Sequence, residues 1–214
     1  MNKFLLELEE LYLKNSEQLE DPYKDIFRQL IDKAIQLYLR QLVKSNHTMM
    51  ELILALHFLK RKKVVDIEKE LGDLIADVLV LNNGKYEELI EIETGFVPPE
   101  YSADPVSYRF AREVSKVARY CKYSDFFSLA CPPFHLLQVP EIFLKAPKER
   151  DEAELKEIKK ILDVYYKALP IEIDDLRNAK IDYIYIINVD NLKVKRLTLN
   201  EYFDLTLNLR KAIF

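Results

Sequence analysis

Apolar side chains recur at helical spacing through the first sixty residues of the chain. Residues 22–43 place an apolar residue every three or four positions, and residues 2–19 do the same, so both segments are predicted to be amphipathic helices. Asp21 before Pro22 is typical of an N-cap followed by proline at the first helical position. A third helix is predicted from Ser45 to the basic run 60–63, whose positive charge suits the carboxyl end of a helix.

After residue 63 the pattern changes to the one typical of strands. We predict strands at residues 64–67, 74–81 and 87–93, and the Asn83-Gly84 pair between the last two is a strong hairpin signal. A helix at 106–122 and a strand at 126–130 follow. The order helix, three strands, helix, strand predicts an α/β fold, with a central mixed β-sheet flanked by helices.

The rest of the chain adds a smaller set of elements. It predicts a helix at 150–168, strands at 181–189 and 192–197, and a terminal helix at 199–209. No repeat or low-complexity linker interrupts the sequence. We therefore predict one domain over 1–214, with N-terminal helices at 1–44, a core at 45–131 and a C-terminal α/β extension at 132–214.

Composition restricts the possible classes of protein. A chain of 214 residues with 49% apolar content can bury a sizeable core, and its three glycines exclude glycine-rich nucleotide loops. We see no signal peptide and no long apolar run, so a cytoplasmic protein without membrane contact is expected. The net charge of −4 argues against a uniformly basic DNA-coating protein but leaves a local basic groove open. Cys121 and Cys131 are predicted to be buried free thiols, because a strand between them exceeds disulfide reach.

Three carboxylates lie at the ends of two adjacent predicted strands. Side chains alternate faces along a strand, so Glu91 and Glu93 share one face, and the hairpin brings Asp77 alongside them. Clustered carboxylates repel one another unless a cation lies between them. Oxygen ligands favour Mg²⁺ or Mn²⁺ over Zn²⁺. The alternative for Asp77 is an ordinary solvated carboxylate at a strand end.

With these residues, the segment 45–131 resembles the PD-(D/E)xK nuclease superfamily, which includes archaeal Holliday-junction resolvases and many restriction endonucleases. The resemblance implies a restriction-endonuclease-like αβββαβ core and a metal-dependent DNA endonuclease, with Asp77 and Glu91 as metal ligands. Glu93 occupies the position that is usually lysine, an E-x-E variant known in some restriction enzymes of the superfamily. The style of the chain also resembles small proteins of archaeal spindle-shaped viruses.

Three further residues are candidates for this site. Glu51 matches the acidic residue of the superfamily's first helix, although Thr48 to Glu51 also fits a capping box. Glu68, at the end of the first strand, is either an additional ligand or part of a surface edge. Among the histidines, only His47 lies close in sequence to the acidic helix.

The helix at 106–122 carries four basic residues on one face, which we predict bind DNA phosphates. They are Arg109, Arg112, Lys116 and Arg119. Lys116 is the candidate for the displaced catalytic lysine, which stabilises charge on the scissile phosphate. A solvated helix face is the alternative.

Two functions from different classes follow. The first is a Mg²⁺- or Mn²⁺-dependent deoxyribonuclease that acts on duplex, branched or single-stranded DNA, and a homodimer would suit duplex or junction cleavage. The second is a DNA-binding protein on a nuclease fold that no longer cleaves. An assembly adaptor without nucleic acid has no motif in its favour.

Overall fold

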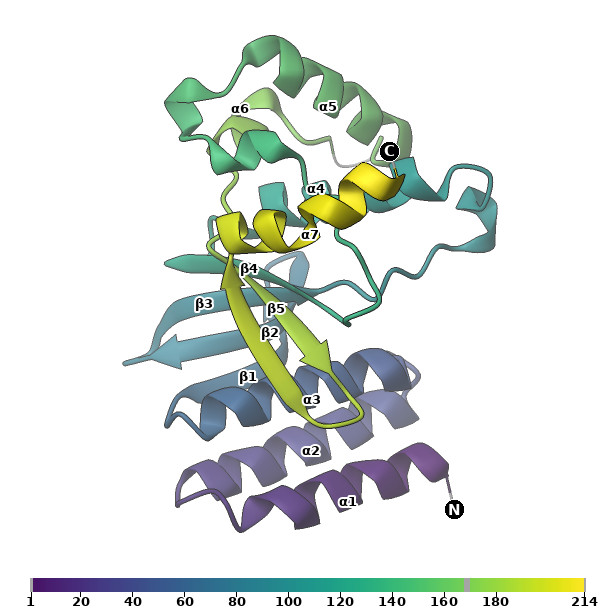
Figure 1. Cartoon of the computed structure of the whole chain (residues 1–214). Helices are drawn as coiled ribbons and strands as arrows, with labels where there is room; N and C mark the ends of the chain where they lie inside the picture. The colour runs from purple at the N-terminus through teal and green to yellow at the C-terminus, as the bar shows by residue number, and fades with distance from the viewer. Residues whose placement is uncertain (1, 168–169, 214) are drawn as a thin grey trace. The chain divides into compact units, whose positions relative to one another are not determined.

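The computed structural model describes residues 2–167 and 170–213 (Figure 1). Its α-helices are α1 (Lys3–Ser16), α2 (Tyr23–Leu39), α3 (Ser45–Leu59), α4 (Pro105–Tyr120), α5 (Glu152–Tyr165), α6 (Ile173–Asn178) and α7 (Leu199–Ile213). Its strands are β1 (Val64–Leu71), β2 (Leu74–Asn82), β3 (Lys85–Ile92), β4 (Phe126–Cys131), β5 (Tyr183–Asn188) and β6 (Lys193–Thr198). Within the described residues, no helix combines the length and apolar character that a membrane crossing requires.

The strands follow their order in the chain within one mixed sheet, β1-β2-β3-β4-β5-β6. β1 pairs with β2 and β2 with β3 in antiparallel fashion, whereas β4 and β5 are parallel. Helices and strands in this combination confirm the predicted α/β class with a central mixed sheet flanked by helices.

The chain separates into two compact units. The first unit comprises Met1–Ile92 and Ile187–Val194, and the second comprises Glu93–Ile186 and Lys195–Phe214. This partition begins at the end of β3.

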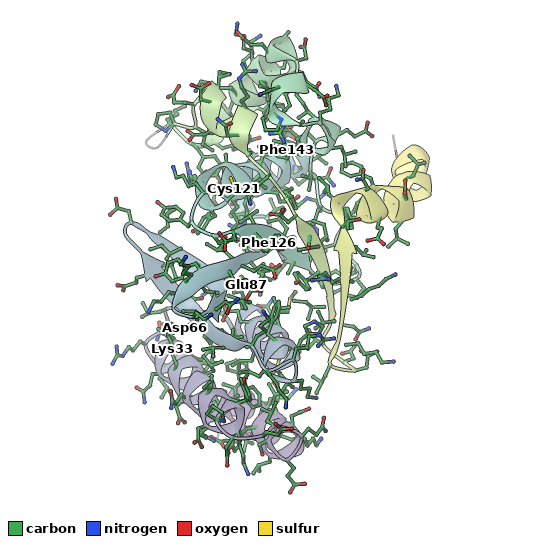
Figure 2. The ribbon with its side chains drawn as sticks, turned by 90° about the vertical axis from the view of Figure 1, so that its left-hand side faces the viewer. Lys33, Asp66, Glu87, Cys121, Phe126 and Phe143 are labelled. Carbon is green, nitrogen blue, oxygen red and sulfur yellow. The ribbon has the colours of Figure 1, made fainter. Side chains whose placement is uncertain are left out.

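In the first unit, α1, α2 and α3 lie side by side next to the antiparallel strands (Figure 1). Helix α3 is buried on nearly every side, including all residues from Met50 to Leu56. A helix that is apolar all round belongs in a core, and α3 contacts both α2 and the strands β1 and β2. Lys33 of α2 pairs with Asp66 of β1 at 2.8 Å and ties this helix to the sheet edge (Figure 2).

In the second unit, α4 is amphipathic and begins at a regular cap. The side chain of Asp104 accepts a hydrogen bond from the Ser107 amide at 3.2 Å, and Pro105 occupies the first turn. A buried guanidinium, that of Arg150, donates to the carbonyls of Leu176 and Ala179 at 3.0 and 2.6 Å. These bonds hold the end of the short helix α6, whose carbonyls have no helical partner.

Three local predictions differ from the structure. Asp21 is not the N-cap of α2, because the carbonyl of Glu20 accepts the first amide hydrogens and Pro22 is the cap residue, without a side-chain hydrogen bond. Strand β1 continues beyond residue 67 to Leu71, since its pairing with β2 extends through the charged stretch 68–70. Helix α6 was not predicted, and the predicted end of α5 at residue 168 lies outside the described residues.

Candidate metal centre

Four side chains with ligand atoms come together inside the first unit. Helix α3 contributes His47 and Glu51, which are one helical turn apart, while β1 contributes Glu68 and β2 contributes Asp77. One nitrogen or oxygen atom of each lies within 4.8 Å of the corresponding atom of the other three. Ligands about 2.0–2.6 Å from one ion lie within about 5 Å of one another. The four atoms therefore have the spacing of a single cation site.

The strand register explains why Glu68 and Asp77 meet. The residues on either side of Glu68 pair with those on either side of Asp77, so the two acids lie opposite each other on neighbouring strands. Like charges at such positions destabilise a sheet. Glu68 also has a φ of 45°, a left-handed conformation that costs a residue other than glycine about 1–3 kcal/mol. Both features are unfavourable for a purely structural strand pair.

Glu51 is the most unusual member of the cluster. Its side chain is completely buried, and neither carboxylate oxygen makes a hydrogen bond to any described residue. Buried carboxyl groups normally have hydrogen-bond partners, because losing hydration without compensation costs free energy. The capping-box alternative is wrong, since α3 begins at Ser45 and Thr48, inside the helix, has a hydroxyl without a hydrogen bond among the described residues.

His47 lies between two of the acids. Its Nε2 atom is 3.2 Å from Asp77 Oδ1 and 3.3 Å from Glu51 Oε1. Burial by itself favours neutral imidazole, but Asp77 and Glu51 outweigh it and raise the pKa of His47 to about 10. Burial, together with the charges of Glu51 and Asp77, raises the pKa of Glu68 to about 8. Without a metal ion, protons therefore offset part of the repulsion within this cluster.

Glu91 lies next to the cluster, on the side of Asp77 that faces away from Glu68. The backbone amide of Asp77 donates to Glu91 Oε1 at 3.1 Å, and the amide of Ile92 donates to Asp77 Oδ2 at 2.6 Å. The hairpin thus brings Asp77 alongside β3, and the side chains of Asp77 and Glu91 are both buried. A solvated strand-end carboxylate, the alternative for Asp77, is therefore wrong. The position of Asp77 between Glu68 and Glu91 directs the Asp77 carboxylate toward His47.

Glu93 has a different environment, within the second unit. Arg112 Nε lies 2.8 Å from its Oε2, and the Lys116 ammonium lies 2.9 Å from its Oε1. Burial favours the neutral acid, but Lys116 and Arg112 outweigh it and lower the pKa of Glu93. Two basic side chains already neutralise this carboxylate, so its burial does not require a metal ion.

The other two basic residues of α4 have their own contacts. The guanidinium of Arg119 lies 4.7 Å from the ring centroid of Tyr166, a cation–π distance. Arg109 donates from Nε to the carbonyl of Pro105 at 3.3 Å. The four basic residues are therefore on α4 as predicted. Arg112 and Lys116 form ion pairs with Glu93, whose negative charge offsets part of their positive charge.

A second buried pair in the second unit was missed from sequence. His135 Nε2 lies 2.9 Å from Glu113 Oε1, and both side chains are almost completely buried. The amide of Gln138 donates to the same carboxylate. Burial raises the pKa of Glu113 despite these contacts. The ring of His135 also packs against Gly95, where a side chain would come within 2.6 Å of Nδ1. Spacing of 22 residues offers no sequence signal for this pair.

The structure therefore groups some of the predicted site residues and separates others. His47, Glu51, Glu68 and Asp77 form the cluster, and Glu91 supports it. Glu93 and Lys116 meet each other, with Arg112. The chain matches no protein-family model, no curated protein and no solved structure in comparisons with each.

Proposed function

We propose that the chain is a divalent-metal-dependent phosphodiesterase acting on DNA, with its metal held by His47, Glu51, Glu68 and Asp77. One observation carries the proposal. The carboxyl group of Glu51 is completely buried beside three further ligand side chains, and its oxygens make no hydrogen bond to a described residue, although His47 Nε2 lies 3.3 Å from Oε1. A cation in the middle of the four would compensate the burial of Glu51 and the repulsion between Glu68 and Asp77.

The donor set fits a divalent cation and favours Mn²⁺. Three carboxylates supply the oxygen ligands that Mg²⁺ and Mn²⁺ both accept. The imidazole of His47 adds a nitrogen ligand, which suits Mn²⁺ and later transition metals better than Mg²⁺. We therefore expect tighter binding of Mn²⁺ than of Mg²⁺.

The surrounding residues have distinct roles in this proposal. A divalent cation, when bound, supplies a water molecule of lowered pKa and neutralises charge on a phosphate group. Ile92 orients Asp77 through its backbone amide, and Glu91 holds the adjacent backbone of Asp77. Within the second unit, the Lys116 ammonium lies 2.9 Å from Glu93, the position where the superfamily has lysine, and we assign Lys116 to contact with DNA phosphates.

DNA as the substrate is supported by the resemblance to the PD-(D/E)xK superfamily. The segment 45–131 contains α3, β1, β2, β3, α4 and β4 in the order of a restriction-endonuclease-like core. The basic residues of α4, including Arg119, suit contact with DNA phosphates. The ion pairing of both Arg112 and Lys116 with Glu93 favours the alternative, a nuclease fold that binds DNA without cleaving it.

The test combines metal binding with cleavage. Calorimetric titration with Mn²⁺ is expected to show one binding site in the wild type. Mn²⁺ affinity is expected to be at least tenfold weaker in Glu68→Gln, and binding is expected to be undetectable in Asp77→Asn. Glu70→Gln is the matched control, because Glu70 lies on the same strand, two residues away, and is exposed. Mn²⁺-dependent cleavage of duplex, branched and single-stranded DNA is then measured with the wild type and Asp77→Ala.

Each outcome separates the alternatives. Cleavage of any substrate that Asp77→Ala abolishes supports the phosphodiesterase. Metal and DNA binding without cleavage supports the binding protein. Equal Mn²⁺ affinity in the wild type, Glu68→Gln and Asp77→Asn would show that this cluster is not a metal centre.

A further inference from the structure

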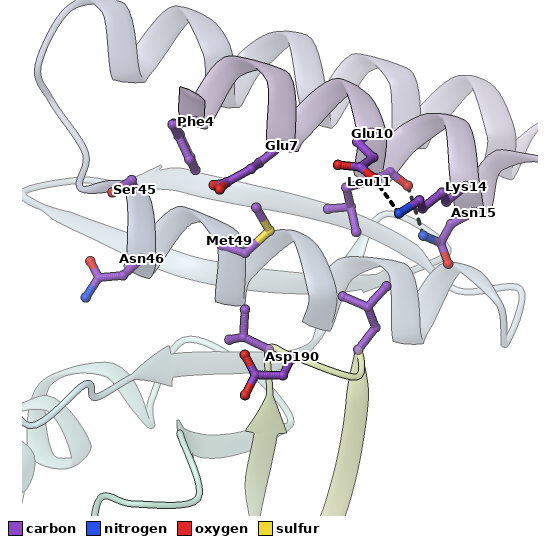
Figure 3. Close-up of a pocket in the computed structure, with 12 residues that line it drawn as sticks. Phe4, Glu7, Glu10, Leu11, Lys14, Asn15, Ser45, Asn46, Met49 and Asp190 are labelled. Carbon is purple, nitrogen blue, oxygen red and sulfur yellow. Dashed lines mark hydrogen bonds and ion pairs between the residues drawn. The ribbon is translucent and has the colours of Figure 1, made fainter. Parts of the chain in front are cut away.

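A cavity of about 550 Å³ opens in the first unit, and the four residues of the acidic cluster are not among those that line it. Figure 3 shows its walls: α1 on one side, the first turn of α3 on another and the turn between β5 and β6 on the third. A cavity of this volume matches the sites that bind small organic molecules. The proposed function gives this cavity no role.

Apolar side chains make up part of the cavity lining. They include Phe4, Leu11, Met49, Val189 and Leu192. Phe4 and Leu11 belong to the core and are 5% exposed, whereas Val189 and Leu192 lie on a turn and are 37% and 38% exposed. Covering apolar side chains on a turn favours ligand binding, because their apolar surface is removed from water. The cavity thus favours a ligand with an apolar body.

The charged groups around this apolar surface are mainly acidic. Three carboxylates line the cavity, those of Glu7, Glu10 and Asp190, and Lys14 is the one basic side chain among the lining residues. Lys14 forms an ion pair with Glu10, and the Lys3 ammonium lies 3.5 Å from Glu7 Oε1, so Asp190 is the lining carboxylate without an ion pair to α1. In Figure 3 the side chains of Glu7 and Met49 both extend into the space between α1 and α3. A carboxylate and a polarisable thioether therefore face the same volume.

We propose that this cavity binds a small organic cation, an amine or quaternary ammonium compound that carries an aliphatic or aromatic group. The apolar group lies against Met49, Val189 and Leu192, and the positive charge lies between Glu7 and Asp190. Anionic ligands are disfavoured, because the three carboxylates of the wall outnumber the two ammonium groups, of Lys3 and Lys14, that pair with them. No residue of the metal centre lines this site, so we expect the ligand to bind without a metal ion.

The experiment is calorimetric titration of the full chain with butyl-, hexyl- and octyl-trimethylammonium below their micelle concentrations, in the presence of EDTA. Affinity is expected to rise by up to about fourfold for each added methylene group. Octyl sulfate, which has the same chain and the opposite charge, is expected to bind at least tenfold more weakly than octyl-trimethylammonium. Equal affinity for the two octyl compounds would overturn the proposed charge recognition.

Variants locate the site. Glu7→Gln and Asp190→Asn are each expected to weaken octyl-trimethylammonium binding by about threefold to fivefold. Val189→Trp, at an exposed turn position, fills the cavity and is expected to abolish binding. Glu17→Gln is the matched control, because Glu17 caps the end of the same helix, is exposed and does not line the cavity. Unchanged affinity in Val189→Trp, or equal effects of Glu7→Gln and Glu17→Gln, would overturn the proposal.

Discussion

Replacing Glu51 with methionine tests the central argument about the metal centre. Methionine has nearly the same length and shape as glutamate and no carboxyl group to solvate. Glu51 is completely buried and its oxygens make no hydrogen bond to described residues, so we expect the native carboxyl group to destabilise the metal-free fold despite its ion pair with His47. We therefore expect Glu51→Met to stabilise the protein in EDTA and to remove its response to Mn²⁺.

The magnitude follows from two opposing effects. A buried polar group without a hydrogen bond costs about 1–3 kcal/mol, and more when it is charged. The substitution also removes the attraction between Glu51 and His47, whose nearest atoms are 3.3 Å apart, but His47 keeps Asp77 as a partner at 3.2 Å. We expect a net gain of about 1–2 kcal/mol. For a chain of this size, that corresponds to an increase in melting temperature of about 2–8 °C.

The assay is thermal unfolding of both proteins at neutral pH, in EDTA and at rising Mn²⁺ concentration. Wild-type protein is expected to gain about 2.7 kcal/mol when the metal concentration reaches 100 times the dissociation constant, whereas Glu51→Met gains none. Glu70→Gln, at an exposed position, is expected to behave like the wild type in both conditions. A lower melting temperature for Glu51→Met in EDTA would refute the reasoning, because Glu51 would then be a stabilising residue of the core.

Three further predictions concern the second unit. Glu93→Gln leaves two basic side chains without their buried carboxylate and is expected to destabilise the protein by about 3 kcal/mol in urea denaturation, whereas Glu20→Gln, at a surface ion pair, leaves the midpoint unchanged. Burial raises the pKa of Cys121 and Cys131, so neither thiol is expected to react with Ellman's reagent at pH 8 until the protein is unfolded. If DNA contacts α4, Arg119→Ala is expected to weaken binding and to reduce the salt dependence by about one phosphate contact, measured as log affinity against log salt.

Local pattern was sufficient for most of the elements, although not for α6 or the full length of β1, and for one pair of site residues. The helical spacing before residue 60, the alternation after it and the Asn83-Gly84 turn predicted α1 to α3 and the β2–β3 hairpin to within a few residues. A tight hairpin also determines which residues face each other. The proximity of Asp77 to Glu91 was therefore predictable from the sequence.

Contacts between distant segments were beyond the reach of local pattern. Sequence spacing did not indicate that Lys116 and Arg112 reach Glu93, and it therefore suggested a metal ion where two basic side chains already compensate the charge. Similarly, sequence spacing did not indicate that Glu113 of α4 is buried against His135. Neither contact could be predicted, because the partners lie on separate elements.

The sequence by itself determined the class of the fold, the position of the central hairpin and the presence of acidic residues beside it. Only the tertiary structure decided which of these acids share a site. Glu51 and His47 join Asp77 and Glu68 because α3 packs against β1 and β2, and that packing depends on the shape of a buried core rather than on residue spacing. A period of 3.6 or 2 residues determines the face of one element, but the distance between side chains on different elements depends on how the whole unit packs.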